Sequence, residues 1–243
     1  LFHEARVDEF GDVELYEETV EIIDRTYKAL GLSEVDVFLV RGASIGVEVI
    51  NLSPLQLLVG EDIVGRSSEA ELAFRAARTS HLVTGENALY SSLPPGERLA
   101  FFGAIMALSD AERGPEYALE MGADEDRIAY WAGFLMEETT EEQRLEWMER
   151  AGRVIDCGDD AFTAWTHWVY SSANRIGLFA AGDFAAAAKC LKGESAIGRQ
   201  LAVSGPADFR ALLSQVPEIA AIYAFAFSPD YWRRRWSVEE WSS

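Results

Sequence analysis

The chain has 243 residues and a formal net charge of −20, from 41 acidic and 21 basic residues. This excess of carboxylates argues against binding to nucleic acid, where lysine and arginine must replace the counterions of the phosphates, and equally against an anionic membrane surface. Hydrophobic residues make up 49% of the chain and aromatic residues 12%, which is ample for a packed core and argues against disorder over most of the length.

The N-terminal part of the sequence predicts a helix followed by a small sheet. Residues 1–11 read as an acidic, flexible lead-in, and over 12–31 apolar residues recur at steps of three and four, which is typical of a helix. The segment 35–40 (VDVFLV) alternates and is rich in β-branched residues, and 45–52 and 55–59 are two further strand candidates. We therefore predict three strands after one helix, paired antiparallel in part.

From residue 67 onward the sequence is typical of helices separated by glycine and proline. The predicted helices cover 67–83, 95–109, 111–121, 124–137, 140–155, 159–180, 183–192, 206–215 and 217–226. No repeat of roughly 20–50 residues is visible, and no low-complexity linker divides the chain. We predict a single α+β domain over 1–243, mostly helical, with its core over 12–182 and a helical C-terminal extension over 183–243.

The segment that leads from the last predicted strand into the next helix has a distinctive layout. Residues 54–82 read PLQLLVGEDIVGRSSEAELAFRAARTSHL: a strand, a turn in which Ser67 is the expected N-cap, and a helix that carries Glu71-Leu72-x-Phe74. This layout resembles the start of the metallopeptidase core in HtpX-like enzymes and the soluble minigluzincins. In those enzymes the helix continues into His-Glu-x-x-His, in which two histidines hold zinc and the glutamate activates water.

The residues that would carry the metal chemistry are replaced in this chain. Aligned on the shared residues, Arg78 stands at the first histidine, Thr79 at the glutamate and Leu82 at the second histidine. Slipping the alignment by one residue makes His81 the second histidine, but Ala77 and Arg78 then take the places of the first histidine and the glutamate. Either alignment predicts that no hydrolytic metal site is present.

A later helix shows the same kind of loss. The family resemblance implies a third zinc ligand on a helix that often reads Glu-x-x-Ala-Asp-Arg, and residues 165–181 read WTHWVYSSANRIGLFAA. Matching Ala173 and Arg175 to that pattern places Tyr170 at the ligand glutamate and Asn174 at the aspartate. A carboxylate is missing at both places.

The resemblance extends to a metal-less domain found at the C-terminus of bacterial tetratricopeptide-repeat proteins. Four segments are similar and follow in the same order: PLQLLVG, GRSSEAELAF, ANRIGLFAAGDFAAAA and FSPDYWRRRW. It implies a zincin-like helical core that has lost zinc, holds no other cofactor and has no peptidase activity, which is the description of a pseudoenzyme.

Two roles are open for Arg78. It either pairs with a neighbouring carboxylate and holds two helices together, or it gives the old cleft a fixed positive charge that binds a carboxylate or a peptide terminus. A metal site built from His81 with Glu86, Asp159 and His167 is less favoured, because no two histidines have metal-ligand spacing.

The two cysteines indicate a reducing compartment. Two are too few for a disulfide framework in a chain of this length, so we expect the cytoplasm. Cys157 lies among acidic residues that would blunt its reactivity, and Cys190 lies in an alanine-rich helix and is expected in the core. No run reaches the ~18 apolar residues that span a bilayer. The chain begins with Leu1 rather than methionine, so we expect it to be a piece of a longer protein.

The C-terminal segment PDYWRRRWSVEEW holds the only dense basic cluster. Arginine and aromatic residues are favoured at protein interfaces, and the interface candidates here are Tyr231, Trp232, Arg233, Arg234, Arg235, Trp236 and Trp241. The alternative is that the segment packs on the acidic body of its own chain.

The leading hypothesis is a catalytically inactive peptidase-like domain that acts as a structural or protein-interaction module in a larger bacterial repeat protein. The alternative is a metal-free enzyme or a small acidic-ligand or peptide-binding domain that uses the remnant cleft of Arg78, His81, Tyr170 and Asn174. A third hypothesis is homo-oligomerisation through the tryptophan-rich end at 228–243.

Overall fold

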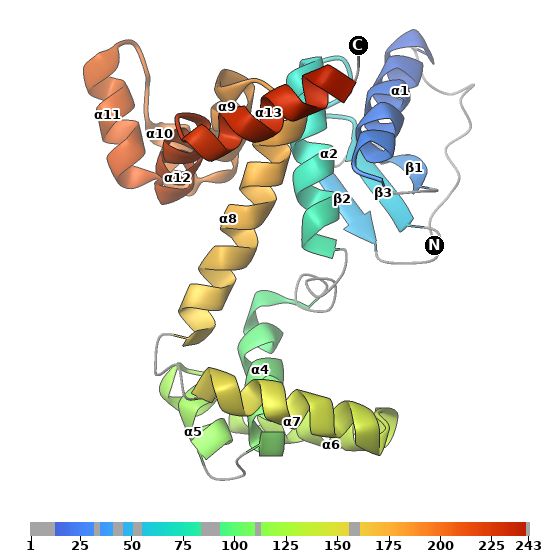
Figure 1. Cartoon of the computed structure of the whole chain (residues 1–243), viewed down its shortest axis with the longest axis vertical. Helices are drawn as coiled ribbons and strands as arrows, with labels where there is room; N and C mark the ends of the chain where they lie inside the picture. The colour runs from blue at the N-terminus through green and yellow to red at the C-terminus, as the bar shows by residue number, and fades with distance from the viewer. Residues whose placement is uncertain are drawn as a thin grey trace. The chain divides into compact units, whose positions relative to one another are not determined.

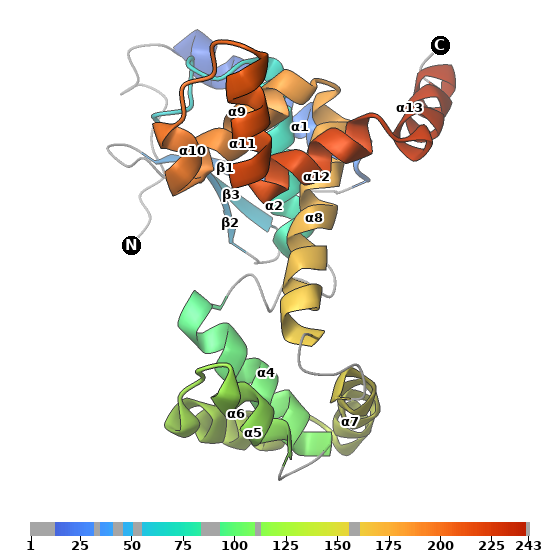
Figure 2. The ribbon, with the colours of Figure 1, turned by 90° about the vertical axis from the view of Figure 1, so that its left-hand side faces the viewer.

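The computed structural model describes residues 13–31, 35–40, 46–50, 55–83, 93–109, 113–155 and 161–241. The chain forms two compact units, unit 1 with residues 1–88 and 169–243 and unit 2 with residues 89–168. The predicted fold class is confirmed: the chain is mostly helical, with a small three-stranded sheet after an N-terminal helix (Figures 1 and 2). The lead-in predicted at 1–11 lies outside the described residues.

Unit 1 begins with helix α1 (Val13–Ala29), followed by the strands β1 (Val35–Val40), β2 (Val47–Ile50) and β3 (Leu55–Gly60). The strand order is β1-β3-β2, with β1 parallel to β3 and β2 antiparallel to β3. The mixed pairing agrees with the prediction. Helices α1 and α2 pack on the sheet through one buried apolar cluster, formed by Ile22, Ile23, Tyr27, Leu39, Leu57, Val59, Ile63, Leu72 and Ala76.

Helix α2 (Glu69–Val83) begins one residue later than its predicted N-cap requires. The hydroxyl of Ser68, rather than that of Ser67, accepts a hydrogen bond of 3.3 Å from the backbone N–H of Glu71. The side chain of Glu71 is buried and turns away from the cap to meet Lys189 at 2.6 Å. The first turn of α2 is thereby tied to helix α9.

The rest of unit 1 is helical. Its elements are α8 (Ala161–Ala181), whose last residues from 169 belong to this unit, α9 (Phe184–Glu194), α10 (Ala196–Gln200), α11 (Pro206–Gln215), α12 (Pro217–Ala226) and α13 (Pro229–Trp241). Gly182 adopts φ +63°, which ends α8 in a left-handed residue. Asp183 then caps α9 by accepting hydrogen bonds from the backbone N–H groups of Ala185 and Ala186 at 2.7 and 3.2 Å. Helices α10 and α13 were not predicted from the sequence.

The C-terminal helices share a core with α2. Phe74 of α2 has no exposed surface and lies in one apolar cluster with Leu178, Ala187, Leu191 and Ile222 of α8, α9 and α12. The domain limits predicted at 12–182 and 183–243 stay a prediction. In the packing, residues 169–243 belong to the same compact unit as α1, α2 and the sheet.

Unit 2 consists of α4 (Pro95–Ser109), α5 (Arg113–Glu120), α6 (Glu125–Glu138) and α7 (Glu141–Ile155). Helix α4 packs against each of the other three, through small residues such as Ala100 and Ala104, which let the helices approach closely. Glu97 accepts hydrogen bonds from Arg127 and Trp131, and these bonds lower the pKa of its carboxyl group. Among the described residues, no helix in either unit is long and apolar enough to cross a bilayer.

At Gly177 the helices α8 and α2 come close together. A Cβ atom at this position would stand 2.9 Å from two ring carbons of Phe74 and from its backbone oxygen. We expect Gly177→Ala to lower the free energy of unfolding by about 1–2 kcal/mol, because the overlap outweighs the gain in helix propensity.

The matched control is Gly193→Ala in α9, where an added Cβ would meet nothing within 4 Å. This substitution should leave stability unchanged or raise it by about 0.5 kcal/mol. Urea unfolding followed by circular dichroism measures both variants. An equal response of the two glycines would contradict the close packing of α2 and α8.

Candidate functional site

Helices α2 and α8 run side by side and bring together the residues predicted for the remnant cleft. Phe74 meets Gly177, Arg78 meets Asn174, and His81 meets Ser172. As the residue numbers rise along α2, the partners fall along α8, so the two helices are antiparallel. The polar contacts lie toward the C-terminal end of α2, where the zinc-peptidase motif would stand.

Arg78 is held by two partners on two different helices. Its Nε donates a 2.6 Å hydrogen bond to Oδ1 of Asn174 in α8, and its Nη1 lies 2.8 Å from Oε2 of Glu194 at the end of α9. The Arg78 side chain is 17% exposed and Asn174 is 2% exposed. Of the two roles left open by the sequence, the contact with a neighbouring carboxylate is present.

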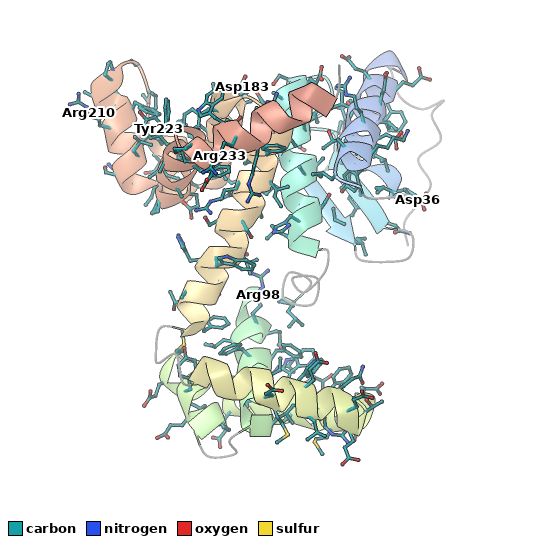
Figure 3. All side chains as sticks on the ribbon, viewed as in Figure 1. Asp36, Arg98, Asp183, Arg210, Tyr223 and Arg233 are labelled. Carbon is teal, nitrogen blue, oxygen red and sulfur yellow. The ribbon has the colours of Figure 1, made fainter. Side chains whose placement is uncertain are left out.

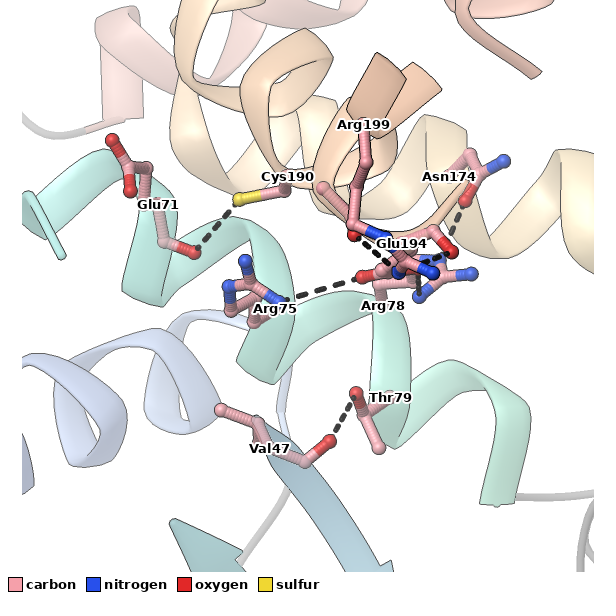
Figure 4. Close-up of polar contacts among 10 residues, drawn as sticks. Val47, Glu71, Arg75, Arg78, Thr79, Asn174, Cys190, Glu194 and Arg199 are labelled. Carbon is pink, nitrogen blue, oxygen red and sulfur yellow. Dashed lines mark hydrogen bonds and ion pairs between the residues drawn. The ribbon is translucent and has the colours of Figure 1, made fainter. Parts of the chain in front are cut away.

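The other residues of this contact were missed by the sequence analysis. Arg75, one turn before Arg78, places its Nη1 3.5 Å from Oε1 of Glu194. Arg199 of α10 donates from Nη1 to the backbone oxygens of Gly193 and Glu194 at 3.0 and 3.5 Å. Figure 4 shows the three guanidinium groups around Glu194. The spacing of Arg75 and Arg78 was the available signal, because residues three apart share a helix face.

The remaining cleft candidates lie around this contact rather than in it. The hydroxyl of Thr79 donates to the backbone oxygen of Val47 in β2 at 3.5 Å (Figure 4). Leu82 and Tyr170 are half-buried. Arg175 is exposed, and its guanidinium lies 5.2 Å from the ring centroid of Phe225 in α12, a cation–π contact. Arg175 is therefore not a partner of the Arg78 contact.

His81 is a half-buried hydrogen-bonding residue. Its Nε2 lies 3.0 Å from the hydroxyl of Ser172, and that hydroxyl donates to the backbone oxygen of Val169 at 2.9 Å. Because the serine has one proton, Nε2 of His81 is the donor in this pair. Burial lowers the pKa of the imidazole, since the charged form loses hydration.

The metal ligands considered for His81 are not assembled in the described part of the chain. Glu86 and Asp159 lie outside the described residues, and His167 is exposed on α8. Within the described ranges, no group of three or more histidine, cysteine, aspartate or glutamate side chains could hold a metal ion.

The lowered pKa of His81 makes stability depend on pH in a definite direction. The folded state binds a proton on His81 less readily than the unfolded state, so the contribution of this residue is intact above the ordinary value of 6.5 and is lost as the pH falls below it. When the pH is lowered from 7.5 to 5.5, we expect the free energy of unfolding to fall less in His81→Gln than in the parent chain. Urea unfolding at both pH values tests this, with His167→Gln at an exposed position as the control. A pH response unchanged by His81→Gln would contradict it.

A second buried contact joins the first turn of α2 to Cys190 of α9, and its environment does not favour a reactive thiol. Burial raises the pKa of the Cys190 thiol to about 11, which makes it a poor nucleophile near neutral pH. Its sulfur lies 3.8 Å from the backbone oxygen of Glu71 (Figure 4). Cys190 is buried in the core, as predicted, whereas Cys157 lies outside the described residues.

The C-terminal interface candidates divide into two groups. Tyr231 is 5% exposed, with its ring 5.5 Å from that of Phe225, and Arg235 donates to the backbone oxygen of Phe179 at 2.9 Å. These two residues anchor α13 to its own chain, which is the alternative that the sequence left open.

The second group faces solvent. Trp232 is 48% exposed, and Arg234 is also exposed. Arg233, labelled in Figure 3, is exposed as well and pairs with Asp230 at 2.5 Å. Trp236 and Trp241 lie in α13, and their side chains are outside the described part of the structure. Among the interface candidates whose side chains the structure describes, Trp232, Arg233 and Arg234 are the exposed ones.

Comparison of the chain with protein-family models, with curated proteins and with solved structures found no match. The resemblance to the HtpX-like and minigluzincin domain therefore stays a prediction carried by the sequence segments.

Proposed function

We propose that this chain is a catalytically inactive, zinc-less relative of the HtpX-like metallopeptidase domain, acting in the cytoplasm as a structural or protein-interaction module of a larger bacterial repeat protein. The observation that carries the proposal is the contact made by Arg78. At the position that the resemblance assigns to a zinc-binding histidine, one guanidinium joins α2 to Asn174 of α8 and Glu194 of α9.

The chemistry of these side chains supports a structural role. A guanidinium is protonated at all relevant pH values and has no lone pair to offer a metal. Thr79, at the position of the glutamate that would activate water, has a hydroxyl bonded to the sheet and no basic group. Leu82 has no donor atom. In place of metal binding and proton transfer, Arg78 makes contacts between helices and Thr79 makes a contact with the sheet.

An interaction role is supported by exposed aromatic side chains at the C-terminal end of unit 1. Phe227 is 69% exposed, Trp232 48% and Tyr223 37%, and the Phe227 and Tyr223 rings lie 4.7 Å apart. Exposed aromatic groups of this kind are frequent at protein interfaces. The partner we propose is a protein, either another chain or a second copy of this one.

Two measurements test the proposed inactivity. Elemental analysis gives the zinc content of the chain purified without chelators, and fluorogenic peptides report any hydrolysis. We expect no stoichiometric zinc and no hydrolysis, with an active zinc peptidase carried through the same steps as the control. One zinc per chain with peptidase activity that a chelator abolishes would overturn the proposal.

Self-association is tested by light scattering on Trp232→Glu. A point substitution is preferable to removing residues 228–243, because that deletion would take away the buried Tyr231. If the molar mass in solution is lower for the variant than for the parent chain, and the fold is intact, the partner is a second copy of this chain. An unchanged mass would turn the search to other proteins.

The metal-free enzyme has no supporting observation among the described residues. The acidic-ligand hypothesis has one, because in the described part of the chain Arg75 and Arg78 share the single carboxylate of Glu194.

A further inference from the structure

Three arginines from two helices gather at the C-terminal end of α9, and two of them share the carboxylate of Glu194 (Figure 4). Arg75 and Arg78 lie one turn apart on α2 and place their Nη1 atoms 3.5 and 2.8 Å from the two oxygens of Glu194. Arg199 of α10 approaches the same end of α9 and donates to the backbone oxygens of Gly193 and Glu194. Two guanidinium groups thus already share one oxyanion.

The charges at this place do not balance. In the described part of the chain, Glu194 is the only carboxylate within ion-pair distance of Arg75 or Arg78, and the hydrogen bonds of Arg199 go to backbone carbonyls. The nearby carboxylate of Glu71 is already paired with Lys189. Two positive charges are therefore left over, offset only in part by the carbonyl end of α9, in a chain whose net charge is −20.

The unbalanced positive charge is partly shielded from solvent. The side chains of Arg75 and Arg78 are 21% and 17% exposed, and Nε of Arg75 is buried without a hydrogen-bond partner. Buried polar groups in proteins are nearly always bonded, and a bound ion is one of the ordinary partners of such a group. Glu194 is more accessible, with 36% of its side chain exposed, so its carboxylate can move into water at little cost.

We propose that Arg75, Arg78 and Arg199 form a binding site for a phosphomonoester dianion, and that Glu194 is the resident anion which the ligand displaces. A phosphoryl group carries a charge of about −1.5 to −2 and three strong acceptor oxygens. When such a group takes the place of the Glu194 carboxylate, its additional negative charge neutralises positive charge on the arginines that Glu194 does not balance. Another carboxylate would bring no gain in charge, so phosphate is the ligand class that the site favours.

The site does not depend on the zinc-less peptidase proposal. Asn174 holds Arg78 through Nε and is not displaced by a ligand at Nη1. The contact between α2 and α8 is therefore kept when a ligand takes the place of Glu194, and only the ion pair with α9 is exchanged. Zinc content and phosphate binding are separate measurements, and either can fail without the other.

The test is isothermal titration calorimetry of the whole chain with inorganic phosphate, against chloride at equal ionic strength. We expect one saturable site. Glu194→Gln, which removes the competing charge and keeps the shape, should tighten phosphate binding by about tenfold, and Arg75→Met or Arg199→Met should weaken it by about tenfold each, as the loss of one charge-assisted hydrogen bond predicts. Arg25→Met, at an exposed ion pair with Glu69, is the matched control and should change nothing.

The outcomes decide the proposal. Absence of saturable binding overturns it, as does binding that Arg75→Met and Arg199→Met leave unchanged, or a Glu194→Gln variant that binds phosphate no more tightly than the parent chain. Circular dichroism confirms that each variant is folded, and Arg75→Gln, which also removes the charge, replaces Arg75→Met if that variant is not. Glycerol phosphate and a neutral peptide with one phosphoserine then distinguish a small molecule from a phosphorylated protein as the source of the group.

Discussion

Phe74→Ala is expected to lower the free energy of unfolding by about 3–5 kcal/mol. Phe74 has no exposed surface and sits where α2 meets α8, α9 and α12, in a cluster that includes Leu178, Leu191 and Ile222. Its ring also fills the space above Gly177. Removing the ring leaves a cavity bounded by helices far apart in the sequence, which cannot all move inward to fill it. Urea unfolding followed by circular dichroism measures the loss.

The matched control for this variant is Phe227→Ala. Phe227 is 69% exposed, so its removal should cost less than about 1 kcal/mol. A loss of under about 1 kcal/mol for Phe74→Ala as well would contradict a core shared by α2 and the C-terminal helices. It would then favour a separate C-terminal extension after residue 182, as the sequence predicts.

The helices that sequence reasoning found have clear boundaries and a regular apolar pattern. Helices α11 and α12 begin at Pro206 and Pro217, as predicted, because proline fits the first turn of a helix and breaks the one before. The missed helices lack these signals. Helix α10 has five residues, and α13 carries its basic residues consecutively, so it shows no three- and four-residue period. It is anchored by the buried Tyr231 instead.

Two residues of the candidate site that lie on long, regular helices were predicted, and the carboxylate contributed by a more distant segment was not. The family resemblance placed Arg78, Tyr170 and Asn174 in one cleft, with Tyr170 facing Arg78. In the structure it is Asn174 that binds Arg78, with 2.6 Å between its Oδ1 and Nε of the arginine. Glu194 comes from the far end of a third helix, which returns to α2 only because Gly182 adopts a left-handed conformation at the end of α8. No local pattern indicates such a contact. Ion pairs between distant segments depend on tertiary packing, which composition and periodicity do not encode.

Arg78→Met is expected to cost about 2–3 kcal/mol of stability, because it removes a charge-assisted hydrogen bond and leaves a buried acceptor unpaired. Asn174, at 2% exposure, has no access to water that could replace the guanidinium. Arg25→Met is again the control, since the Arg25 and Glu69 side chains are 59% and 65% exposed and such pairs contribute less than about 1 kcal/mol.

A double-mutant cycle separates the contact from the general loss of a long side chain. Asn174→Leu should be destabilising alone, and Arg78→Met combined with Asn174→Leu should cost less than the sum of the two, with a coupling energy of about 1–2 kcal/mol. Equal costs for Arg78→Met and Arg25→Met, with no coupling, would mean that Arg78 is a solvated surface charge. The proposal that this position holds three helices together would then fail, and the arginines around Glu194 would have only ligand binding to explain them.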